Sequence, residues 1–230
     1  FGQLPDFLDV SMDDLPFRLR LGAAQKTGFF LDQKCNQRQI GNWSRGLRVL
    51  DCFCNQGGFS LQAARGGARE ILGLDSSDEA ISSAKENAVL FSQKHPDLKA
   101  PLFQTADVFD FLNAAKDRGD RWDLVIVDPP AFAKNKKSAI PALKAYARLN
   151  QAAFEVLADE GILATGSCSM HVEEERFFQA VEQAAFKTGK KLSWLSRGGQ
   201  APDHPILAVM SETRYLKWGV FRVEPLALKS

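Results

Sequence analysis

LRVLDCFCNQGGF, at residues 47–59, is the stretch that indicates how the chain folds. A short apolar run ends at Asp51, a turn carries Gly57 and Gly58, and residues with helical spacing follow. Strand, glycine-bearing turn and helix make the first βα unit of an open α/β sheet, in which ligands bind beyond the carboxyl ends of the strands. An ordinary tight turn is the alternative. A second acid, Asp75, ends the next apolar run and suits the two hydroxyls of a ribose, which favours a ligand site.

Strands and helices alternate along the rest of the chain. Strands are predicted at 47–53, 70–75, 100–106, 122–128, 161–167, 191–196 and 215–223, and helices near 58–66, 78–92, 108–118, 138–158 and 172–188. The pattern predicts a Rossmann-like α/β fold with a mostly parallel, seven-stranded sheet covered by helices on both faces. The last strand follows a loop, which leaves an antiparallel insertion open.

An N-terminal β-hairpin is expected before this sheet. Two short apolar runs, at 7–11 and 16–21, flank a polar turn. We therefore expect a hairpin extension over residues 1–25 and the main domain over residues 26–230. A mostly polar helix should follow and end near Gly41.

Composition limits the class of protein. With 230 residues, 45% of them hydrophobic, the chain can bury one large core, and its net charge of +1 gives no general attraction to nucleic acid. No apolar run reaches the roughly 18 residues that a membrane span needs. The four cysteines lack paired zinc-ligand spacing, so we expect free thiols, no metal and a cytoplasmic protein. The start, FGQLPDFLDV, has neither initiator Met nor signal-peptide layout, as a piece of a longer chain would.

The first turn also indicates which nucleotide cofactor is bound. It lacks the G-x-G-x-x-G of dinucleotide-binding folds and the G-K-[ST] of phosphate-binding loops. S-adenosylmethionine has no pyrophosphate and needs one carboxylate near its amino group and one near its ribose, which Asp51 and Asp75 could supply. Asp107 could accept a hydrogen bond from the adenine amino group, with Val108 and Phe109 against the ring. Asp107 could equally cap a helix, and both roles are compatible.

Two further strand ends carry groups suited to a pyrimidine. Asp128 is followed by Pro129 and Pro130, which lack N–H donors, so carbonyls and a carboxylate stay free to accept from an exocyclic amino group. Cys168 follows the fifth strand of the main sheet and should lie on the same edge. A thiolate that attacks C6 of cytosine makes C5 nucleophilic enough to take a methyl group. The alternative for Cys168 is a small packing residue.

Basic and aromatic side chains near this edge predict contact with RNA. Phe132 could stack on an extruded base, and His204, in the Gly- and Pro-rich loop 197–213, could line the pocket or brace the loop. The lysines expected to contact phosphates are Lys134, Lys136 and Lys137. For Lys144 and Arg148, phosphate contact and a solvated helix face are equally good interpretations.

Eight segments together resemble a known family. They are QKTGFFLDQ (25–33), VLDCFCNQGGFSLQAA (49–64), GLDSSDEA (73–80), ADVFDFL (106–112), DPPAFAKNKKS (128–138), GSCS (166–169), GQAPDHP (199–205) and ETRYLK (212–217). The chain resembles class I S-adenosylmethionine-dependent methyltransferases of bacterial 23S ribosomal RNA, above all those that form 5-methylcytosine. The resemblance implies that Cys168 is the nucleophile and that Asp128 orients the pyrimidine, with Pro129, Pro130 and Phe132 beside it. It implies cofactor contacts from Thr27, Phe29, Asp51, Phe53, Asn55, Gly57, Phe59, Asp75, Ser76, Asp107, Val108 and Asp128.

The sequence departs from the family in two respects. Family members carry an N-terminal RNA-binding PUA domain that has no counterpart in these residues, so we expect weaker RNA binding or a different substrate. Many RNA cytosine-5 methyltransferases have a second cysteine where this chain has Ala131, which leaves the base that removes the C5 proton unassigned. His171 and Glu173 are candidates, or plain helix-start residues. Methylation of a base nitrogen (guanine N7 or N2), with Cys168 a spectator, and a non-catalytic cofactor-binding module associated with RNA are the competing hypotheses.

Overall fold

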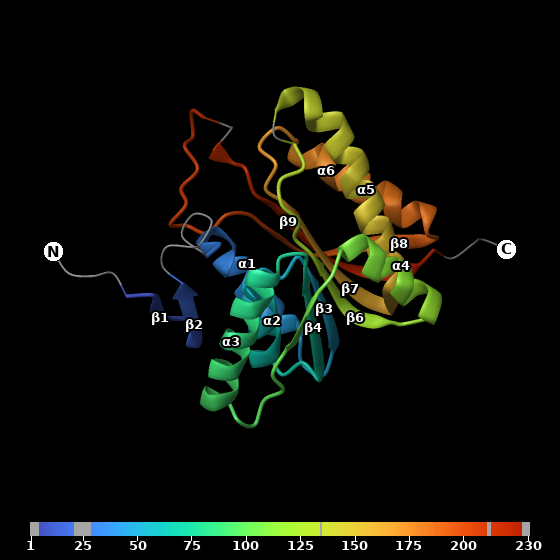
Figure 1. Ribbon diagram of the computed structural model, residues 1–230. Coiled ribbons are helices and arrows are strands. Elements are labelled where there is room, and N and C mark those ends of the chain that lie inside the picture. Colours follow the sequence, from blue (N-terminus) through green and yellow to red (C-terminus); the bar gives the residue numbers. More distant parts are fainter. Residues whose placement is uncertain (1–4, 21–28, 134, 211–212, 227–230) are drawn as a thin grey trace.

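A seven-stranded sheet runs through the middle of the molecule, and a separate two-stranded hairpin lies beside it (Figure 1). The computed structural model describes residues 5–20, 29–133, 135–210 and 213–226. The strands are β1 (Phe7–Met12), β2 (Leu15–Arg20), β3 (Arg48–Cys52), β4 (Glu70–Asp75), β5 (Leu102–Thr105), β6 (Trp122–Val127), β7 (Leu157–Ser167), β8 (Lys190–Gly198) and β9 (Lys217–Pro225). The α-helices are α1 (Lys34–Trp43), α2 (Gly58–Arg65), α3 (Asp78–Lys94), α4 (Val108–Arg118), α5 (Ala139–Val156) and α6 (Glu174–Lys187), with 3-10 turns η1 (Leu31–Gln33) and η2 (Lys136–Ser138).

The order of strands in the large sheet is β5-β4-β3-β6-β7-β9-β8. Neighbours from β5 to β7 are parallel, whereas β9 is antiparallel to both β7 and β8. The predicted fold class is therefore confirmed, including the antiparallel insertion of the last strand. Because β3 to β7 run the same way, their carboxyl ends meet at one edge of the sheet.

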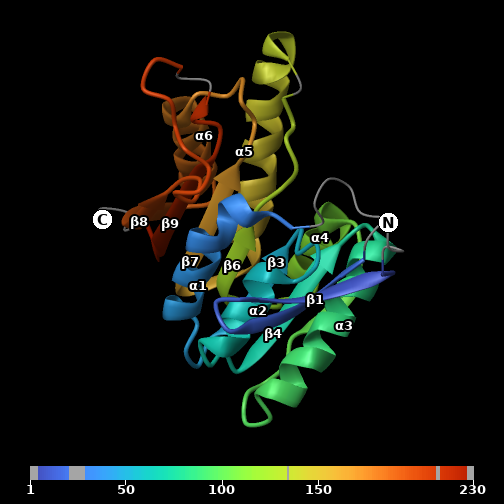
Figure 2. The same cartoon turned by 90° about the vertical axis from the view of Figure 1, so that its left-hand side faces the viewer.

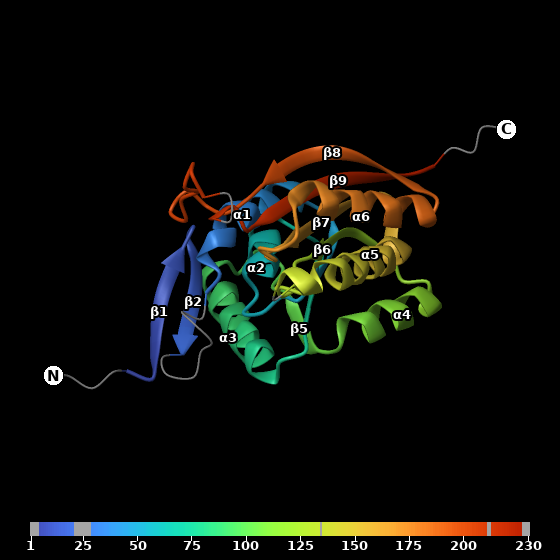
Figure 3. The same ribbon diagram turned by 90° about the horizontal axis from the view of Figure 1, so that it is seen from above.

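Helices cover both faces of this sheet. The helices α1, α2 and α3 lie on one face and α4, α5 and α6 on the other (Figure 3). The central strand β6 shows why its sequence is continuously apolar. Leu124 and Ile126 face the core under the first layer, while Val125 and Val127 face the core under the second. All four are fully buried, as expected of a strand with helices on both sides.

The N-terminal hairpin is attached to the first helical layer, as Figure 2 shows. Leu15 and Phe17 of β2 are fully buried in the same core as α1 and α2. The backbone N–H of Arg18 donates to Oδ1 of Asn87 in α3 at 2.8 Å. The predicted hairpin is thus confirmed, while the predicted boundary between residues 25 and 26 falls outside the described residues and stays a prediction.

Some predicted element limits were wrong. The predicted helix 138–158 ends instead at Val156, because Leu157 already pairs with Trp122 of β6 and starts β7. The polar helix continues beyond Gly41 to Trp43. Within the described residues, none of the helices has the length and apolar character needed to cross a membrane.

Candidate active site

Four predicted site residues lie at the carboxyl edge of adjacent strands. Asp51 is the next-to-last residue of β3, Asp75 the last of β4, and Asp128 and Cys168 directly follow β6 and β7. In the sheet register, Asp51 lies between Gly73 of β4 and Ile126 of β6. The charge of Asp75 helps to raise the pKa of Asp51, and the charge of Asp51 helps to raise that of Asp128. The structure therefore brings these groups together.

Asp51 is a buried carboxyl with one satisfied oxygen. Its Oδ2 accepts hydrogen bonds from the N–H and the hydroxyl of Ser60, at 3.1 and 2.6 Å. Its Oδ1 is also buried and accepts no hydrogen bond from the described residues. Burial is the main cause that raises the pKa of this carboxyl to about 7. A bound ammonium group would supply the missing donor and favour the ionised form.

The turn after β3 is held in a conformation that few residues adopt. Phe53, Asn55 and Gly57 have φ angles of 67°, 47° and 88°. For Phe53 and Asn55 such angles cost energy, and clusters of them mark ligand-binding turns. The N–H of Asn55 donates to Oδ2 of Asp75 at 3.0 Å. Each oxygen of an ionised carboxylate has a second lone pair, so Asp75 can hold this turn and still accept from another donor.

Other predicted cofactor residues lie at the start of α4, directly after β4 and in α2. The carboxylate of Asp107 caps α4 by accepting from the N–H of Asp110 at 3.1 Å, so the helix-cap interpretation is confirmed. Val108 is buried and Ser76 is exposed. Phe59 is buried and stacks on Trp218 with 4.9 Å between ring centroids, beneath the turn.

The segment before α1 contributes Asp32 and Gln33 to the same edge. Nε2 of Gln33 donates to Oδ2 of Asp128 at 2.8 Å. The pKa of Asp128 is raised to about 7, chiefly by burial and then by the charges of Asp51 and Asp32. The hydroxyl of Tyr215 donates to Oδ2 of Asp32 at 2.7 Å. Segments far apart in the sequence thus close over the end of β6.

Phe29, a predicted cofactor contact, packs against the N-terminal hairpin. It meets Phe17 of the hairpin edge-on, with 4.5 Å between ring centroids, and lies against the core under the first helical layer. Thr27 and Lys134, predicted to contact cofactor and RNA, lie outside the described residues.

Cys168 lies in a firmly held Ser-Cys-Ser segment and is half-buried. The hydroxyl of Ser169 is hydrogen-bonded to that of Tyr146 at 2.8 Å and accepts from the N–H of Ala133 at 3.1 Å. Nζ of Lys217 donates to the carbonyl of Ser169 at 2.6 Å. These bonds fix the thiol relative to the Asp-Pro-Pro turn. Burial and the charge of Asp128 raise the pKa of the thiol, while Lys217 lowers it.

Sequence reasoning missed three residues of this site. Gln33, Tyr146 and Lys217 contact Asp128 or Ser169, yet Gln33 lies 95 residues from Asp128 and Lys217 lies 48 from Ser169. No local pattern predicts such contacts. The only signals were the family-like segments at 25–33 and 212–217, which contain Gln33 and Lys217.

The predicted RNA-contacting residues differ in solvent exposure and in packing. Lys136 and Lys137 are exposed in the turn η2, whose start is capped by Asn135. The ring of Phe132 packs on Tyr146, with centroids 4.7 Å apart. Pro129 is buried, whereas Pro130 is exposed.

Of the remaining candidates, His204 and Arg148 contact other side chains, whereas Glu173 is exposed. His204 is hydrogen-bonded through Nδ1 to its sequence neighbour Asp203 at 3.2 Å. The guanidinium of Arg148 lies over the ring of Phe109 at 5.7 Å. Glu173 is the first flanking residue of α6 and is exposed, as a helix-start residue would be.

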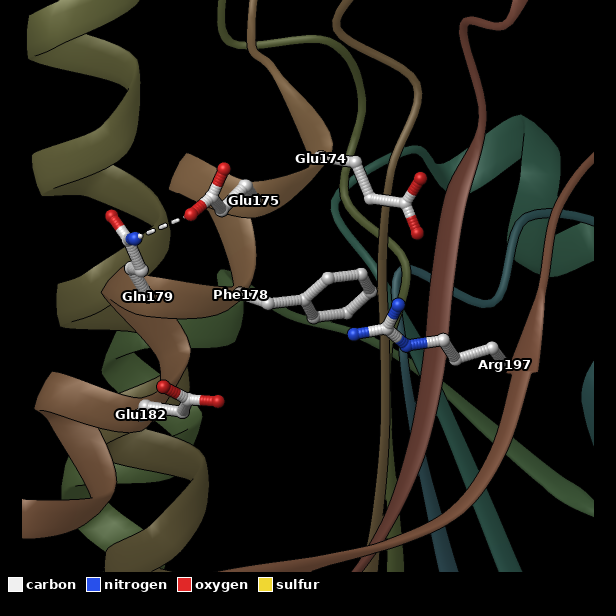
Figure 4. Close-up of a pocket in the computed structure, with 6 residues that line it drawn as sticks. All are labelled: Glu174, Glu175, Phe178, Gln179, Glu182 and Arg197. Atoms are coloured by element: carbon white, nitrogen blue, oxygen red, sulfur yellow. Dashed lines mark hydrogen bonds between the residues drawn. The ribbon is translucent and has the colours of Figure 1, made fainter.

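A surface hollow of about 530 Å³ lies elsewhere, between α6 and β8 (Figure 4). Its walls contain none of the predicted site residues, and the guanidinium of Arg197 lies beside the ring of Phe178 (Figure 4), 5.7 Å from its centroid. Among the residues that the structure describes, no group of three or more His, Cys, Asp or Glu side chains could hold a metal ion.

Comparison with known proteins assigns the chain to a family. The family model described as S-adenosylmethionine-dependent methyltransferase matches residues 2–207. The chain belongs to this family. S-adenosylmethionine is accordingly the cofactor, and the unpaired, buried Oδ1 of Asp51 fits a group that carries an ammonium.

Individual relatives agree with this assignment. The chain is 38% identical over 224 residues to "Ribosomal RNA large subunit methyltransferase I" of Tolumonas auensis, covering 96% of this chain and 56% of that protein. It is 43% identical over 220 residues to "Ribosomal RNA large subunit methyltransferase" of Deinococcus radiodurans, covering 94% and 52%. The chain thus spans about half the length of the curated relatives it matches. The crystal structure of SMU.776 complexed with SAH matches in fold, with a TM-score of 0.84 at 24% identity over 96% of this chain and 57% of that one.

Proposed function

We propose that this methyltransferase forms 5-methylcytosine in large-subunit ribosomal RNA, with Cys168 as the nucleophile. The observation that carries the proposal is the position of the thiol. Cys168 lies half-buried beside Asp128, in a segment held by Ser169, on the strand edge that also carries Asp51 and Asp75. The names of its relatives support ribosomal RNA as the substrate.

The acidic strand ends form the proposed cofactor site. Oδ1 of Asp51 accepts from the ammonium of the methionine part, and Asp75 accepts from the ribose hydroxyls. Asp107 and Val108 contact the adenine at the start of α4. The left-handed turn through Asn55 and Gly57 brings the backbone close to the ligand. The buried, unsatisfied oxygen of Asp51 supports this arrangement.

Asp128 orients the target base in this proposal. Gln33 occupies its Oδ2, which leaves Oδ1 for the pyrimidine. With a pKa of about 7, the carboxyl is available both ionised, accepting from the exocyclic amino group, and protonated, donating to N3. Protonation at N3 withdraws electrons from C6 and so prepares that atom for attack.

Cys168 then activates C5. The thiolate forms a C–S bond at C6, and the electron pair of the C5=C6 bond becomes available at C5. S-adenosylmethionine supplies an electrophilic methyl group to C5 when it is bound. A base takes the C5 proton, the electron pair re-forms C5=C6, and the C–S bond breaks to release the thiolate. As the C5–methyl bond forms, the methyl–sulfur bond of the cofactor would break, and S-adenosylhomocysteine would leave with the electron pair. Asp128 regains the proton it gave to N3, and the base passes the C5 proton to solvent, so the enzyme returns to its starting state.

Exposed groups beside the site are proposed to hold the RNA. Lys136 and Lys137 contact phosphates, and Pro130 and Phe132 contact the base after it leaves the stack. Phosphate contacts of this kind give affinity without reading sequence.

Methyl transfer followed by nucleoside analysis tests the proposal. Unmodified 23S ribosomal RNA made by transcription is incubated with the protein and with S-adenosylmethionine labelled in its methyl group. The expected product is labelled 5-methylcytidine. Cys168→Ala should lose more than about a thousandfold in turnover, whereas the control Cys35→Ala, at an exposed position, should keep full activity.

Label in a guanosine derivative, or full activity of Cys168→Ala, would contradict the proposal. The first result would move the reaction to a base nitrogen, and the second would make Cys168 a packing residue. Cofactor binding without transfer to the transcript would also refute it and would favour a cofactor-binding module without catalysis.

A further inference from the structure

Lys217 is a buried cation that has no acidic partner among the described residues. Lys217 is only 2% exposed to solvent. Its Nζ donates to two backbone carbonyls, those of Ser169 at 2.6 Å and Tyr215 at 2.8 Å. In the described part of the chain, no Asp or Glu carboxylate lies within 4.0 Å of Nζ. Buried charges are normally paired, because burial without a counter-charge costs several kcal/mol.

The sheet register places this cation against the segment that carries Cys168. Lys217 is the first residue of β9 and pairs with Ser167, the last residue of β7. From there its side chain reaches the carbonyl of Ser169. Lys217 therefore contacts both neighbours of Cys168. It pairs with Ser167 through the strand backbone and donates to Ser169 through its ammonium.

The charges around Cys168 come from several elements. Asp128 at the end of β6 and Asp32 before α1 both disfavour the thiolate, and Lys217 is the cation in the described structure that favours it. The thiol also interacts electrostatically with the phenols of Tyr146 on α5 and of Tyr215.

Lys217 in turn responds to the charge of the thiol. Burial lowers the pKa of Lys217 to about 8, and the negative charges of Cys168 and Glu174 raise it. The ammonium and the thiolate thus stabilise each other.

We propose that Lys217 is a positioning residue that holds its positive charge beside Cys168, so that the thiolate forms and attacks. The proton of the thiol leaves to solvent, Lys217 keeps its own protons, and no bond to its nitrogen forms or breaks. This inference rests on the proposed role of Cys168 as nucleophile, yet the thiolate it requires can be measured without any RNA.

Alkylation by iodoacetamide tests the inference directly. The thiolate attacks the methylene carbon and iodide leaves, so the rate follows the thiolate fraction. Rates at Cys168 and at the exposed Cys35 are followed between pH 7 and pH 10 by mass spectrometry of peptides. Lys217→Met should slow alkylation of Cys168 at pH 7, where Lys217 is mostly charged, about tenfold, which corresponds to one unit of thiol pKa, and Lys217→Arg should largely preserve the rate. The rate at Cys35 should not change in either variant.

An unchanged rate at Cys168 in folded Lys217→Met would overturn the inference. Far-UV circular dichroism and the affinity for S-adenosylhomocysteine establish that the variant is folded. A nucleoside analysis that finds no 5-methylcytidine would refute the proposed function, while the alkylation rates would still report on the pairing of Lys217 with Cys168.

A second measurement on the unmodified protein applies if Lys217→Met does not fold. The pKa of Lys217 is followed by NMR of protein labelled in the lysine side chains, before and after alkylation of Cys168. Blocking the thiol removes the negative charge of its ionised fraction, so the pKa of Lys217 should fall, because the coupling is mutual. An unchanged pKa would overturn the inference.

Discussion

Replacing Asp51 by Asn should make the protein without cofactor more stable at high pH, relative to the unmodified protein. The pKa of Asp51 in the folded state is about 7, against an ordinary value of 3.8. Because the folded pKa is the higher one, the folded state binds more protons. Stability is therefore greatest at low pH and falls as pH rises between the two pKa values.

The size of the effect follows from this difference. At about 1.4 kcal/mol per pH unit, ionisation of Asp51 costs ~2.5 kcal/mol of folding free energy between pH 5 and pH 8. The amide introduced by Asp51→Asn does not titrate, so the variant keeps that free energy. The amide oxygen would still accept from Ser60, although the NH₂ would lack an acceptor, a cost of about 1–3 kcal/mol that does not depend on pH.

Urea unfolding at pH 5, 6, 7 and 8 without cofactor measures the effect. The free energy of unfolding of Asp51→Asn minus that of the unmodified protein should rise by ~2.5 kcal/mol over this range. The exposed Asp97→Asn is the control, and its difference should stay within about 0.5 kcal/mol. A difference for Asp51→Asn that is flat with pH would refute the reasoning. The same variant should bind S-adenosylhomocysteine at least about a hundredfold more weakly, because it lacks the charge for the ammonium.

Three further predictions concern the frame of the site. Tyr146→Phe removes the hydroxyl bonded to Ser169 and should lower the free energy of unfolding in urea by about 1–2 kcal/mol. Replacing Lys136 and Lys137 together by Ala should weaken RNA binding and reduce the slope of log affinity against log salt by about 2, as measured by filter binding. Gly57→Ala introduces a side chain at a φ of 88° and within 2.7 Å of a buried ring. It should lower the free energy of unfolding by at least about 1 kcal/mol and weaken cofactor binding, as measured by calorimetry.

Each of these predictions has its own control. Gly46→Ala has a similar φ of 74° with open space around the added carbon, so it should leave cofactor affinity unchanged. Equal losses of affinity in both glycine variants would contradict a specific role for the first turn. The lysine variant should keep cofactor affinity, and a salt slope that does not change would remove these lysines from the RNA surface. Full stability of Tyr146→Phe would show that its hydroxyl does not hold the Ser-Cys-Ser segment.

The sequence predicts the sheet well because each strand is specified locally. The apolar run before Asp128 coincides with β6, and the acids at successive strand ends indicate the edge where we propose the site. The carboxyl ends of parallel strands meet at one edge of the sheet, however the connecting helices pack. Asp51, Asp75 and Asp128 could therefore be assigned to one edge from the sequence alone.

Contacts made across the fold were beyond local patterns. In the sequence, Lys217 is an ordinary residue of an apolar strand. In the structure, the pairing of β7 with β9 buries it beside Cys168. Gln33 reaches Asp128 because the segment before α1 folds over the end of β6. The resemblance implies a cofactor contact for Phe59, and only the structure shows that its ring also packs on Trp218, a residue from the far end of the chain.

Trapping of a covalent complex tests the central claim most directly. An RNA that carries 5-fluorocytidine at the target position, with S-adenosylmethionine present, should form a C–S bond that cannot be released, because fluorine at C5 does not leave as a cation. The account predicts a complex that survives denaturation, with the RNA attached at Cys168 by mass spectrometry, and none with Cys168→Ala. Methylation of the RNA without any such complex, or attachment at another residue, would contradict it.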